Sequence, residues 1–350
     1  MTIEQNMTAL SEEGKVILAA DESPTTMNGR LEKVGIVNPT ETHRRAWRQL
    51  IITTPGLSNF VAGIILHPET LSQATTDGRP FTGILRAAGI KTGVKVDTGL
   101  EDFGKPGEQT TKGLEGLPAR LQQYAAQGAA FAKWRAVYKI TDETPSDAIF
   151  TENAKRLAAY AKASQDAGLI PIVEPEVLMD GDHSFGRNLK VTEYALAHVS
   201  EQLLKHGVNL TQIILKPNMV TEGASYVGTR ATPNQVAAGT LLALAEIPID
   251  VPMIAFLSGG QPEERVNANL MAINQNVRNA QNDGQRFTGS FGRSLLNAAL
   301  NIWKGNPDDV GAGQRTILGS TARASMASQG RPIGGPIGGA TGAILHPQVR

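Results

Sequence analysis

Eight short apolar runs, each followed by a stretch long enough to form a helix, predict that the chain folds as an α/β protein, a (β/α)8 TIM barrel. Several runs are rich in valine and isoleucine and lack helical periodicity, which is typical of buried parallel strands. The length of 350 residues also suits this fold, because a single α/β barrel often exceeds about 200 residues.

The predicted strands alternate with predicted helices along the chain. Clear helix candidates are 151–168, 191–207 and 232–246, and Gly168 and Gly207 stand where a helix C-cap is expected. The predicted strands are KVILAAD (15–21), FVAGIILH (60–67), IKTGVKVD (90–97), FAKWRAV (131–137), IPIVEPEV (170–177), QIILKPN (212–218), MIAFLSG (253–259) and RFTGSFG (286–292).

The main alternative to the barrel is a doubly wound open sheet. No glycine-rich dinucleotide fingerprint follows the first predicted strand, which weighs against that alternative. We therefore expect a single barrel domain over residues 1–329. The segment GRPIGGPIGGATG (330–342) has no packing pattern, so residues 330–350 are predicted to form a flexible C-terminal tail. A mobile lid over the active site is the less common reading of such a tail.

Composition excludes several functional classes. The formal net charge is zero, so neither nucleic acid nor a membrane is expected as a partner. The chain has no cysteine, which excludes disulfides and thiolate metal sites. No apolar run reaches the roughly 18 residues that span a bilayer, and the N-terminus does not resemble a signal peptide. We expect a cytoplasmic protein.

Charged residues gather at the predicted strand ends, where barrel enzymes place the active site. Residues two apart on a strand share a face, so Lys133 and Arg135 point the same way, as do Glu174 and Glu176. Buried charges of both signs must pair with one another or bind a ligand. The candidates are Asp21, Lys95, Lys133, Arg135, Glu174, Glu176, Lys216, Ser258, Gly259, Gly292 and Arg293.

Lys216 is the candidate nucleophile, although a lysine at a strand end is commonly a surface residue. Repulsion from a second lysine and desolvation both favour the neutral amine, which is the form that attacks a carbonyl. Glu174 and Glu176 are either ion-pair partners of the lysines or general acid–base groups. Asp21 is either a helix cap or an acid–base group.

Glycines after the seventh and eighth predicted strands indicate an anion site. Backbone N–H groups approach a ligand closely where glycine leaves room, and Arg293 adds a bidentate donor. Barrels commonly bind phosphate in these two loops. The alternative is that LSGGQ (257–261) forms only a turn.

Neither a metal nor a cofactor is predicted. The six histidines form no close-spaced ligand pair, and GDH (181–183) is a lone polar loop for which a structural role is the commoner reading. Magnesium bound by aspartate and glutamate alone stays open at this stage.

Nine motifs carry a resemblance to a known family. The chain resembles the class I fructose-1,6-bisphosphate aldolases over about residues 14–301. So many long matches in the same order are highly specific. They are LAADES (18–23), GRPF (78–81), GVKVD (93–97), FAKWR (131–135), PIVEPE (171–176), GDH (181–183), LKPNMV (215–220), FLSGGQ (256–261) and SFGR (290–293).

The resemblance implies reversible cleavage of fructose 1,6-bisphosphate to dihydroxyacetone phosphate and glyceraldehyde 3-phosphate, in glycolysis or gluconeogenesis. Lys216 matches the Schiff-base lysine, and Lys133 the lysine that helps carbinolamine formation. Glu174 resembles the acid–base group of imine formation, with Glu176 in the same proton network. Asp21 matches the group that takes the C4 hydroxyl proton. A protonated imine stabilises the carbanion as a metal does in another aldolase class.

The resemblance also implies partners and phosphate contacts. It implies sugar-phosphate ligands, no cofactor and a homo-oligomer, which is a tetramer in the family. The residues that match the pocket for the C1 phosphate are Ser258, Gly259, Gly292 and Arg293. Those that match contacts to the rest of the substrate, including the C6 phosphate, are Lys95, Arg135 and Arg30.

Two departures from the family pattern stand out. Gly29 precedes Arg30 at a position where many members have a lysine, so one cationic contact to phosphate is missing. Familiar members end in a tyrosine that assists proton transfer, whereas this chain ends HPQVR and its last tyrosine is Tyr226. His346 is the candidate substitute as proton carrier.

Two rival functions stay open at this stage. One is a Schiff-base aldolase for fructose 1-phosphate or sedoheptulose 1,7-bisphosphate, although the many anion contacts favour a bisphosphate. The other is a non-catalytic barrel that binds sugar phosphates or a protein partner. The presence of Lys216, Glu174 and Asp21 together weighs against the second rival.

Overall fold

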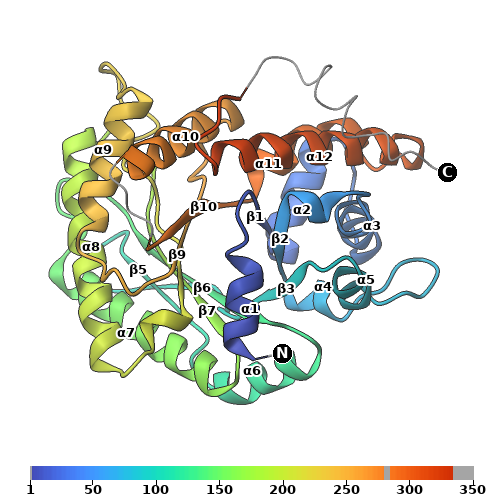
Figure 1. The fold of residues 1–350 in the computed structure, drawn as a ribbon, viewed down its shortest axis with the longest axis horizontal. Coiled ribbons are helices and arrows are strands. Elements are labelled where there is room, and N and C mark those ends of the chain that lie inside the picture. The colour runs from blue at the N-terminus through green and yellow to red at the C-terminus, as the bar shows by residue number, and fades with distance from the viewer. Residues whose placement is uncertain (1, 280–283, 334–350) are drawn as a thin grey trace.

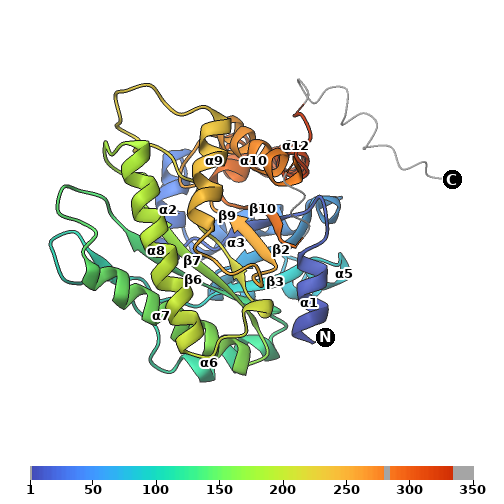
Figure 2. The same ribbon diagram turned by 60° about the vertical axis from the view of Figure 1, so that its left-hand side comes forward.

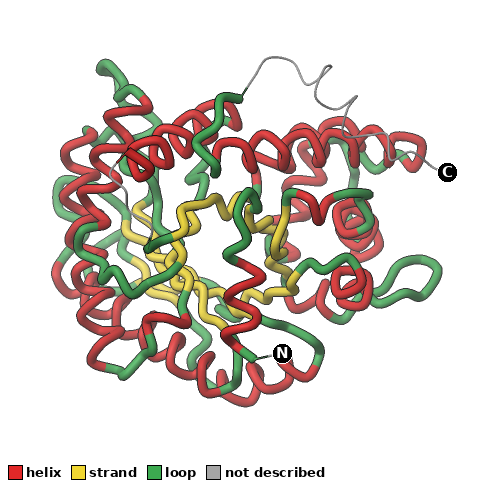
Figure 3. The backbone as a smooth tube through the Cα atoms, in the orientation of Figure 1, coloured by secondary structure: helices red, strands yellow, loops and turns green. Residues whose placement is uncertain are grey.

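The computed structural model describes residues 2–279 and 284–333, and its centre is a closed barrel of eight parallel strands (Figure 1). The strands form a ring inside a shell of helices (Figure 3). This arrangement confirms the predicted (β/α)8 barrel. The order around the ring is β1 (Val16–Ala20), β10 (Arg286–Phe291), β9 (Met253–Phe256), β8 (Ile214–Leu215), β7 (Ile170–Val177), β6 (Phe131–Tyr138), β3 (Lys91–Lys95) and β2 (Val61–Leu66).

Helices cover the outside of the barrel, as the second view shows (Figure 2). Short 3-10 turns also occur at Leu57–Asn59, Leu210–Gln212 and Pro307–Asp309. The outer helices are α2 (Pro24–Lys33), α3 (Glu41–Ile52), α4 (Pro68–Leu71), α5 (Phe81–Ala87), α6 (Leu117–Ala126), α7 (Asp147–Asp166), α8 (Phe185–Lys205), α9 (Pro233–Leu244), α10 (Glu263–Asn279), α11 (Arg293–Trp303) and α12 (Val310–Ala327).

The N-terminal helix α1 (Ile3–Leu10) packs at the end of the barrel where the strands begin (Figure 1). Its first turn is fixed by a capping box between Thr2 and Gln5. Met7 and Leu10 contact an apolar layer inside the barrel that includes Ile17, Ala62, Phe131, Ile170, Ile172, Ile214 and Met253. This end is filled with apolar side chains, and the charged residues that line the cavity described below lie at the opposite end of the barrel.

All eight strands lie within or overlap the predicted runs, and the three helix candidates correspond to α7, α8 and α9. Gly168 and Gly207 follow α7 and α8 in the left-handed region, with φ of 77° and 64°. One hairpin was not predicted. Its strands β4 (Leu100–Asp102) and β5 (Gln109–Thr111) pair antiparallel outside the barrel.

Three predictions concern the ends of the chain and its relation to membranes. The division into a domain at 1–329 and a tail at 330–350 stays a prediction, since residues 334–350 lie outside the described residues. His346 lies there as well. In the part of the chain that the structure describes, no helix is both long and apolar enough to cross a bilayer.

Candidate active site

A cavity of about 300 Å³ opens where the strands end, opposite α1. All twelve site residues singled out from the sequence line this cavity, although they come from eight separate segments. The sequence reasoning did not single out Glu22, Ser23, Thr26 or Ser290, which also line it. The twelve predicted residues are Asp21, Arg30, Lys95, Lys133, Arg135, Glu174, Glu176, Lys216, Ser258, Gly259, Gly292 and Arg293.

Four charged side chains form a connected cluster at the centre of the cavity. Oε1 of Glu174 lies 3.2 Å from Nζ of Lys216, and Oε2 lies 3.1 Å from Nζ of Lys133. Nζ of Lys133 also donates to Oδ2 of Asp21 over 2.9 Å. Their side chains are at most 11% exposed, so the charges compensate one another almost without solvent.

Neighbouring strands bring this cluster together. Lys133 lies in β6 and Glu174 in the adjacent β7, while Lys216 directly follows β8. The backbone N–H of Lys216 donates to the carbonyl of Val173 over 2.8 Å, so the β7–β8 ladder reaches the lysine itself. Because parallel strands end at the same edge of the barrel, residues more than 80 positions apart in the sequence meet there.

Two members of the cluster, Asp21 and Lys133, are held in their ionised forms. Burial alone raises the pKa of Asp21, but the ammonium groups of Lys133 and Lys216 outweigh it and hold that pKa well below its ordinary value. Burial opposes the charge on Lys133 as well, yet the carboxylates of Asp21 and Glu174 raise its pKa above the usual range. Lys133 is therefore a fixed cation and Asp21 a fixed anion at neutral pH.

Two further ion pairs flank the cluster. Nε of Arg135 donates to Oε2 of Glu176, and Nζ of Lys95 lies 3.1 Å from Oδ1 of Asp97. The side chain of Arg135 is 34% exposed and that of Lys95 is 19% exposed, whereas their partners are nearly buried. These two cations therefore reach the open part of the cavity and can contact a ligand.

The other side of the cavity combines arginines with a helix N-terminus. The helix α11 begins at Arg293, so its first N–H groups lie beside the cavity. Gly292 is required there, since a Cβ at this position would lie 2.9 Å from the carbonyl oxygen of Ala19. This side of the cavity can hold a phosphate group.

Glu22 organises the arginines. It pairs with Arg30 and, over 2.8 Å, with Arg48, while Arg30 also donates to Asn297 over 2.9 Å. Burial and the neighbouring Arg48 and Arg293 lower the pKa of Arg30 to about 10, which leaves it charged at neutral pH. Glu22 was visible in the sequence within Asp21-Glu22-Ser23, but nothing in the sequence indicated that it has two arginine partners.

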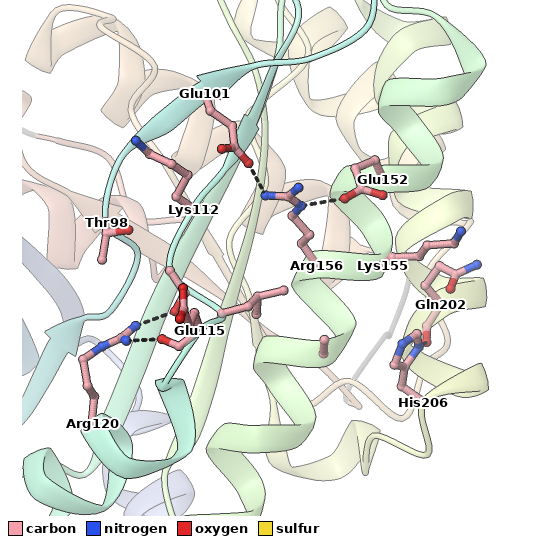
Figure 4. Close-up of a pocket in the computed structure, with 13 residues that line it drawn as sticks. Thr98, Glu101, Lys112, Glu115, Arg120, Glu152, Lys155, Arg156, Gln202 and His206 are labelled. Atoms are coloured by element: carbon pink, nitrogen blue, oxygen red, sulfur yellow. Dashed lines mark hydrogen bonds and ion pairs between the residues drawn. The ribbon is translucent and has the colours of Figure 1, made fainter.

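A wider groove of about 880 Å³ lies on the outside of the barrel, between the β4–β5 hairpin and the helices α7 and α8 (Figure 4). Its two arginines have partners close by. Arg156 joins Glu101 and Glu152, each over 2.7 Å, and Arg120 donates to the carbonyl of Glu115. Because the lysine–carboxylate cluster is absent from this groove, the smaller axial cavity is the candidate active site.

The fold and the cavity together define a barrel enzyme with an axial lysine and a site for phosphorylated ligands. Residues 2–344 match the model of the family described as fructose-bisphosphate aldolase class-I. A fructose-bisphosphate aldolase of Drosophila melanogaster is 46% identical over 335 residues, which cover 95% of this chain and 91% of the relative. Fructose-bisphosphate aldolase 5, cytosolic, of Arabidopsis thaliana is 45% identical over 328 residues, which cover 93% and 90%.

A solved structure agrees with these relatives. The fructose-bisphosphate aldolase of Plasmodium falciparum, in complex with TRAP and a small-molecule inhibitor, has a TM-score of 0.91 and 37% identity, with 95% of each chain covered. The chain belongs to the class I fructose-bisphosphate aldolase family. It is a lyase that acts on sugar phosphates and cleaves fructose 1,6-bisphosphate reversibly to dihydroxyacetone phosphate and glyceraldehyde 3-phosphate through a Schiff base.

Proposed function

We propose that Lys216 is the lysine that forms the Schiff base. The observation that carries this assignment is the carboxylate of Glu174, which lies within 3.2 Å of Nζ in both Lys216 and Lys133. Glu174 can take a proton from Lys216 and release the neutral amine, which then attacks the C2 carbonyl of the substrate. The cation of Lys133 stabilises the developing carbinolamine oxygen.

Glu174 also serves the next step. The carbinolamine loses its hydroxyl group as water when Glu174 returns a proton to it, and the lone pair of the Lys216 nitrogen forms the imine. The protonated imine then withdraws electrons from C3. In this assignment the carboxyl group of Glu174 first accepts a proton and then donates it. Its position between Nζ of Lys216 and Nζ of Lys133 supports both roles.

Asp21 acts in the cleavage step. We assign it as the base that takes the proton of the C4 hydroxyl while the C3–C4 bond breaks, which leaves an enamine on Lys216 and releases the aldehyde product. Its low pKa keeps it ionised and so available as a proton acceptor. Glu176 holds Arg135 and belongs to the same proton network.

The two ends of the cavity suit the two phosphates. We assign the C1 phosphate to Ser258, Gly259, Gly292 and Arg293, beside the N-terminus of α11. We assign the rest of the substrate, including the C6 phosphate, to Lys95, Arg135 and Arg30. A panel of fructose 1,6-bisphosphate, fructose 1-phosphate and sedoheptulose 1,7-bisphosphate tests the preference for a bisphosphate through kcat/KM.

Trapping of the imine tests the central assignment. The protein is mixed with dihydroxyacetone phosphate in EDTA, reduced with borohydride, and mapped by mass spectrometry. An adduct is expected on Lys216, and it should disappear in Lys216→Met. Lys155→Met, a change of an exposed lysine on α7, is the matched control. An adduct on Lys133 instead, or none with folded protein, would overturn the assignment.

We also infer a cytoplasmic homo-oligomer, and a tetramer by resemblance to the family. Names of relatives support the location, since those from Arabidopsis thaliana are called cytosolic and one from Spinacia oleracea is called a cytoplasmic isozyme. Light scattering after size-exclusion chromatography measures the oligomeric state. A mass near the 37.2 kDa of one chain would contradict the oligomer.

A further inference from the structure

The backbone ladder beside Lys216 is interrupted. The register of β7 and β8 pairs Val173 with Leu215, which places Glu174 opposite Lys216. The N–H of Lys216 donates to the carbonyl of Val173. In a parallel ladder the next bond would run from the N–H of residue 175 to the carbonyl of Lys216, but Pro175 has no N–H. The ladder therefore loses a bond at the level of the proposed catalytic pair.

The side chain of Asn218 supplies the next link between the two strands. Its Oδ1 accepts a hydrogen bond from the N–H of Val177 over 3.0 Å, in the place of a backbone carbonyl. Its Nδ2 donates to Oγ1 of Thr192 over 3.2 Å and to the carbonyl of Met219 over 3.3 Å. Pro217, directly after Lys216, likewise has no N–H to offer the strand on the other side.

Thr192 continues the chain of hydrogen bonds into α8. Its hydroxyl donates to Oδ1 of Asn188 over 3.2 Å, and Nδ2 of Asn188 lies 3.2 Å from Nε2 of His183. The carbonyl of His183 accepts from the N–H of Gly223, in the loop that follows β8, over 2.9 Å. The hydrogen bonds thus form a circuit that joins the loop after β7, the helix α8 and the loop after β8.

The residues of this circuit are buried, so each of their hydrogen bonds is costly to lose. Asn218 is 3% exposed, Thr192 2% and Asn188 1%, so water cannot replace a partner that is removed. A buried amide that loses its partner is left unsatisfied, and the backbone must shift to satisfy it. On the side of β7, the end of β8 is therefore held by side chains where the backbone bonds stop, whereas on the other side the carbonyl of Pro217 still accepts from the N–H of Leu257 over 3.0 Å.

We propose that Asn218 and Thr192 are positioning residues for the aldol reaction. They hold the end of β8 against β7 and so fix the separation of the Lys216 amine from the Glu174 carboxylate. This inference rests on the proposed roles of Lys216 and Glu174. Neither positioning residue lines the cavity, so they affect the chemical steps and not the binding of substrate.

The test compares Thr192→Val, which keeps the shape but removes the hydroxyl, with Thr192→Ser, which restores it. Asn218→Leu removes all three hydrogen bonds of the Asn218 side chain. The readouts are kcat, KM and the single-turnover rate at which borohydride traps the Lys216 adduct. We expect Thr192→Val and Asn218→Leu to lower kcat and the trapping rate about tenfold or more, because small displacements of reacting groups are costly. KM should stay within about twofold, and Thr192→Ser should regain most of the rate.

Thr321→Val is the matched control, since Thr321 is also fully buried in a helix but bonds only to carbonyls of its own helix α12. It should lower the thermal midpoint as Thr192→Val does, with kcat unchanged. If Thr192→Val is folded and keeps kcat, or if Thr321→Val loses as much kcat, positioning by Asn218 and Thr192 is refuted. Absence of any wild-type adduct on Lys216 would instead refute the proposed function.

Discussion

Nζ of Lys133 lies 2.9 Å from Oδ2 of Asp21 and is the cation that keeps this buried carboxylate ionised. The same Nζ lies 3.1 Å from Glu174, so one ammonium group compensates two buried carboxylates. Lys133→Met would remove the ion-pair partner of Asp21 and leave Glu174 paired with Lys216 alone, in a site almost free of solvent. We expect a loss of about 3–5 kcal/mol of stability and a fall in kcat of about a hundredfold. Urea unfolding and initial rates measure the two effects, and Lys155→Met should change neither.

The difference in unfolding free energy between wild type and Lys133→Met should become smaller as the pH falls. The pKa of Asp21 is lower in the folded state, so its pairing stabilises the fold above the unfolded-state pKa of about 3.9. This stabilisation is lost as the pH falls below that value toward the folded-state pKa. Unfolding free energies at pH 7 and pH 3.5 should therefore show a smaller gap at the lower pH. An equal gap at both pH values would argue against the pairing of Asp21 with Lys133.

Lys95 should determine preference for a second phosphate. Its ammonium pairs with Asp97 but is partly exposed to the cavity, where a phosphate can displace that contact. Lys95→Met should raise KM for fructose 1,6-bisphosphate about tenfold, because a charge-assisted contact is lost. KM for fructose 1-phosphate should stay nearly constant. Lys112→Met in the outer groove is the control, and equal effects on both substrates would contradict the assignment of Lys95.

A lysine in place of Gly29 should add a contact to a phosphate of the substrate. Gly29 lies within α2 beside Arg30, and a Cβ there would meet nothing within 4 Å. Gly29→Ala should stabilise the protein by about 1 kcal/mol, since glycine is a poor helix former. Gly29→Lys should add the same stability and also lower KM for the bisphosphate about two- to fivefold through a partly solvated contact. Thermal unfolding and KM separate the two effects, and a KM equal to that of Gly29→Ala would show that residue 29 does not reach the phosphate.

The sequence was sufficient for the barrel and for most of the lining of its cavity, because the strands and their ends follow from short-range patterns. Arg30 came from the family resemblance alone, and Glu22, Ser23, Thr26 and Ser290 were not predicted. Runs such as FVAGIIL (60–66) are apolar throughout, as a strand between two layers must be. The hairpin of β4 and β5 was missed, because LED and QTT are only three residues long and mostly polar. Their pairing is a matter of backbone hydrogen bonds, which leave no periodic signature.

Contacts between distant residues could not be predicted from one sequence. Asn218 and Thr192 lie 26 residues apart, and Glu22 meets Arg48 across a similar gap. Each residue taken alone resembles an ordinary polar position in a loop or a helix. Their roles appear only when the strands close into a ring, because closure decides which side chains face one another. The prolines 175 and 217 were visible, but the missing ladder bonds depend on the strand register.

His183 should make stability sensitive to mild acid. Its Nε2 lies opposite the amide nitrogen of Asn188, so it acts as an acceptor only when the ring is neutral. Burial lowers the pKa of His183 and Arg187 lowers it further, whereas the carboxylates of Asp182 and Glu222 oppose this shift.

A lowered histidine pKa means that the stabilisation is present above the unfolded-state value of about 6.5 and is lost as the pH falls below it. Between pH 7.5 and pH 5.5, the thermal midpoint should therefore fall more in wild type than in His183→Gln, which has no ring to protonate. His206→Gln, at the exposed end of α8, is the control and should retain the full wild-type dependence on pH. If His183→Gln instead follows the wild-type curve, another group is responsible for the acid sensitivity, and the neutral acceptor role of His183 is wrong.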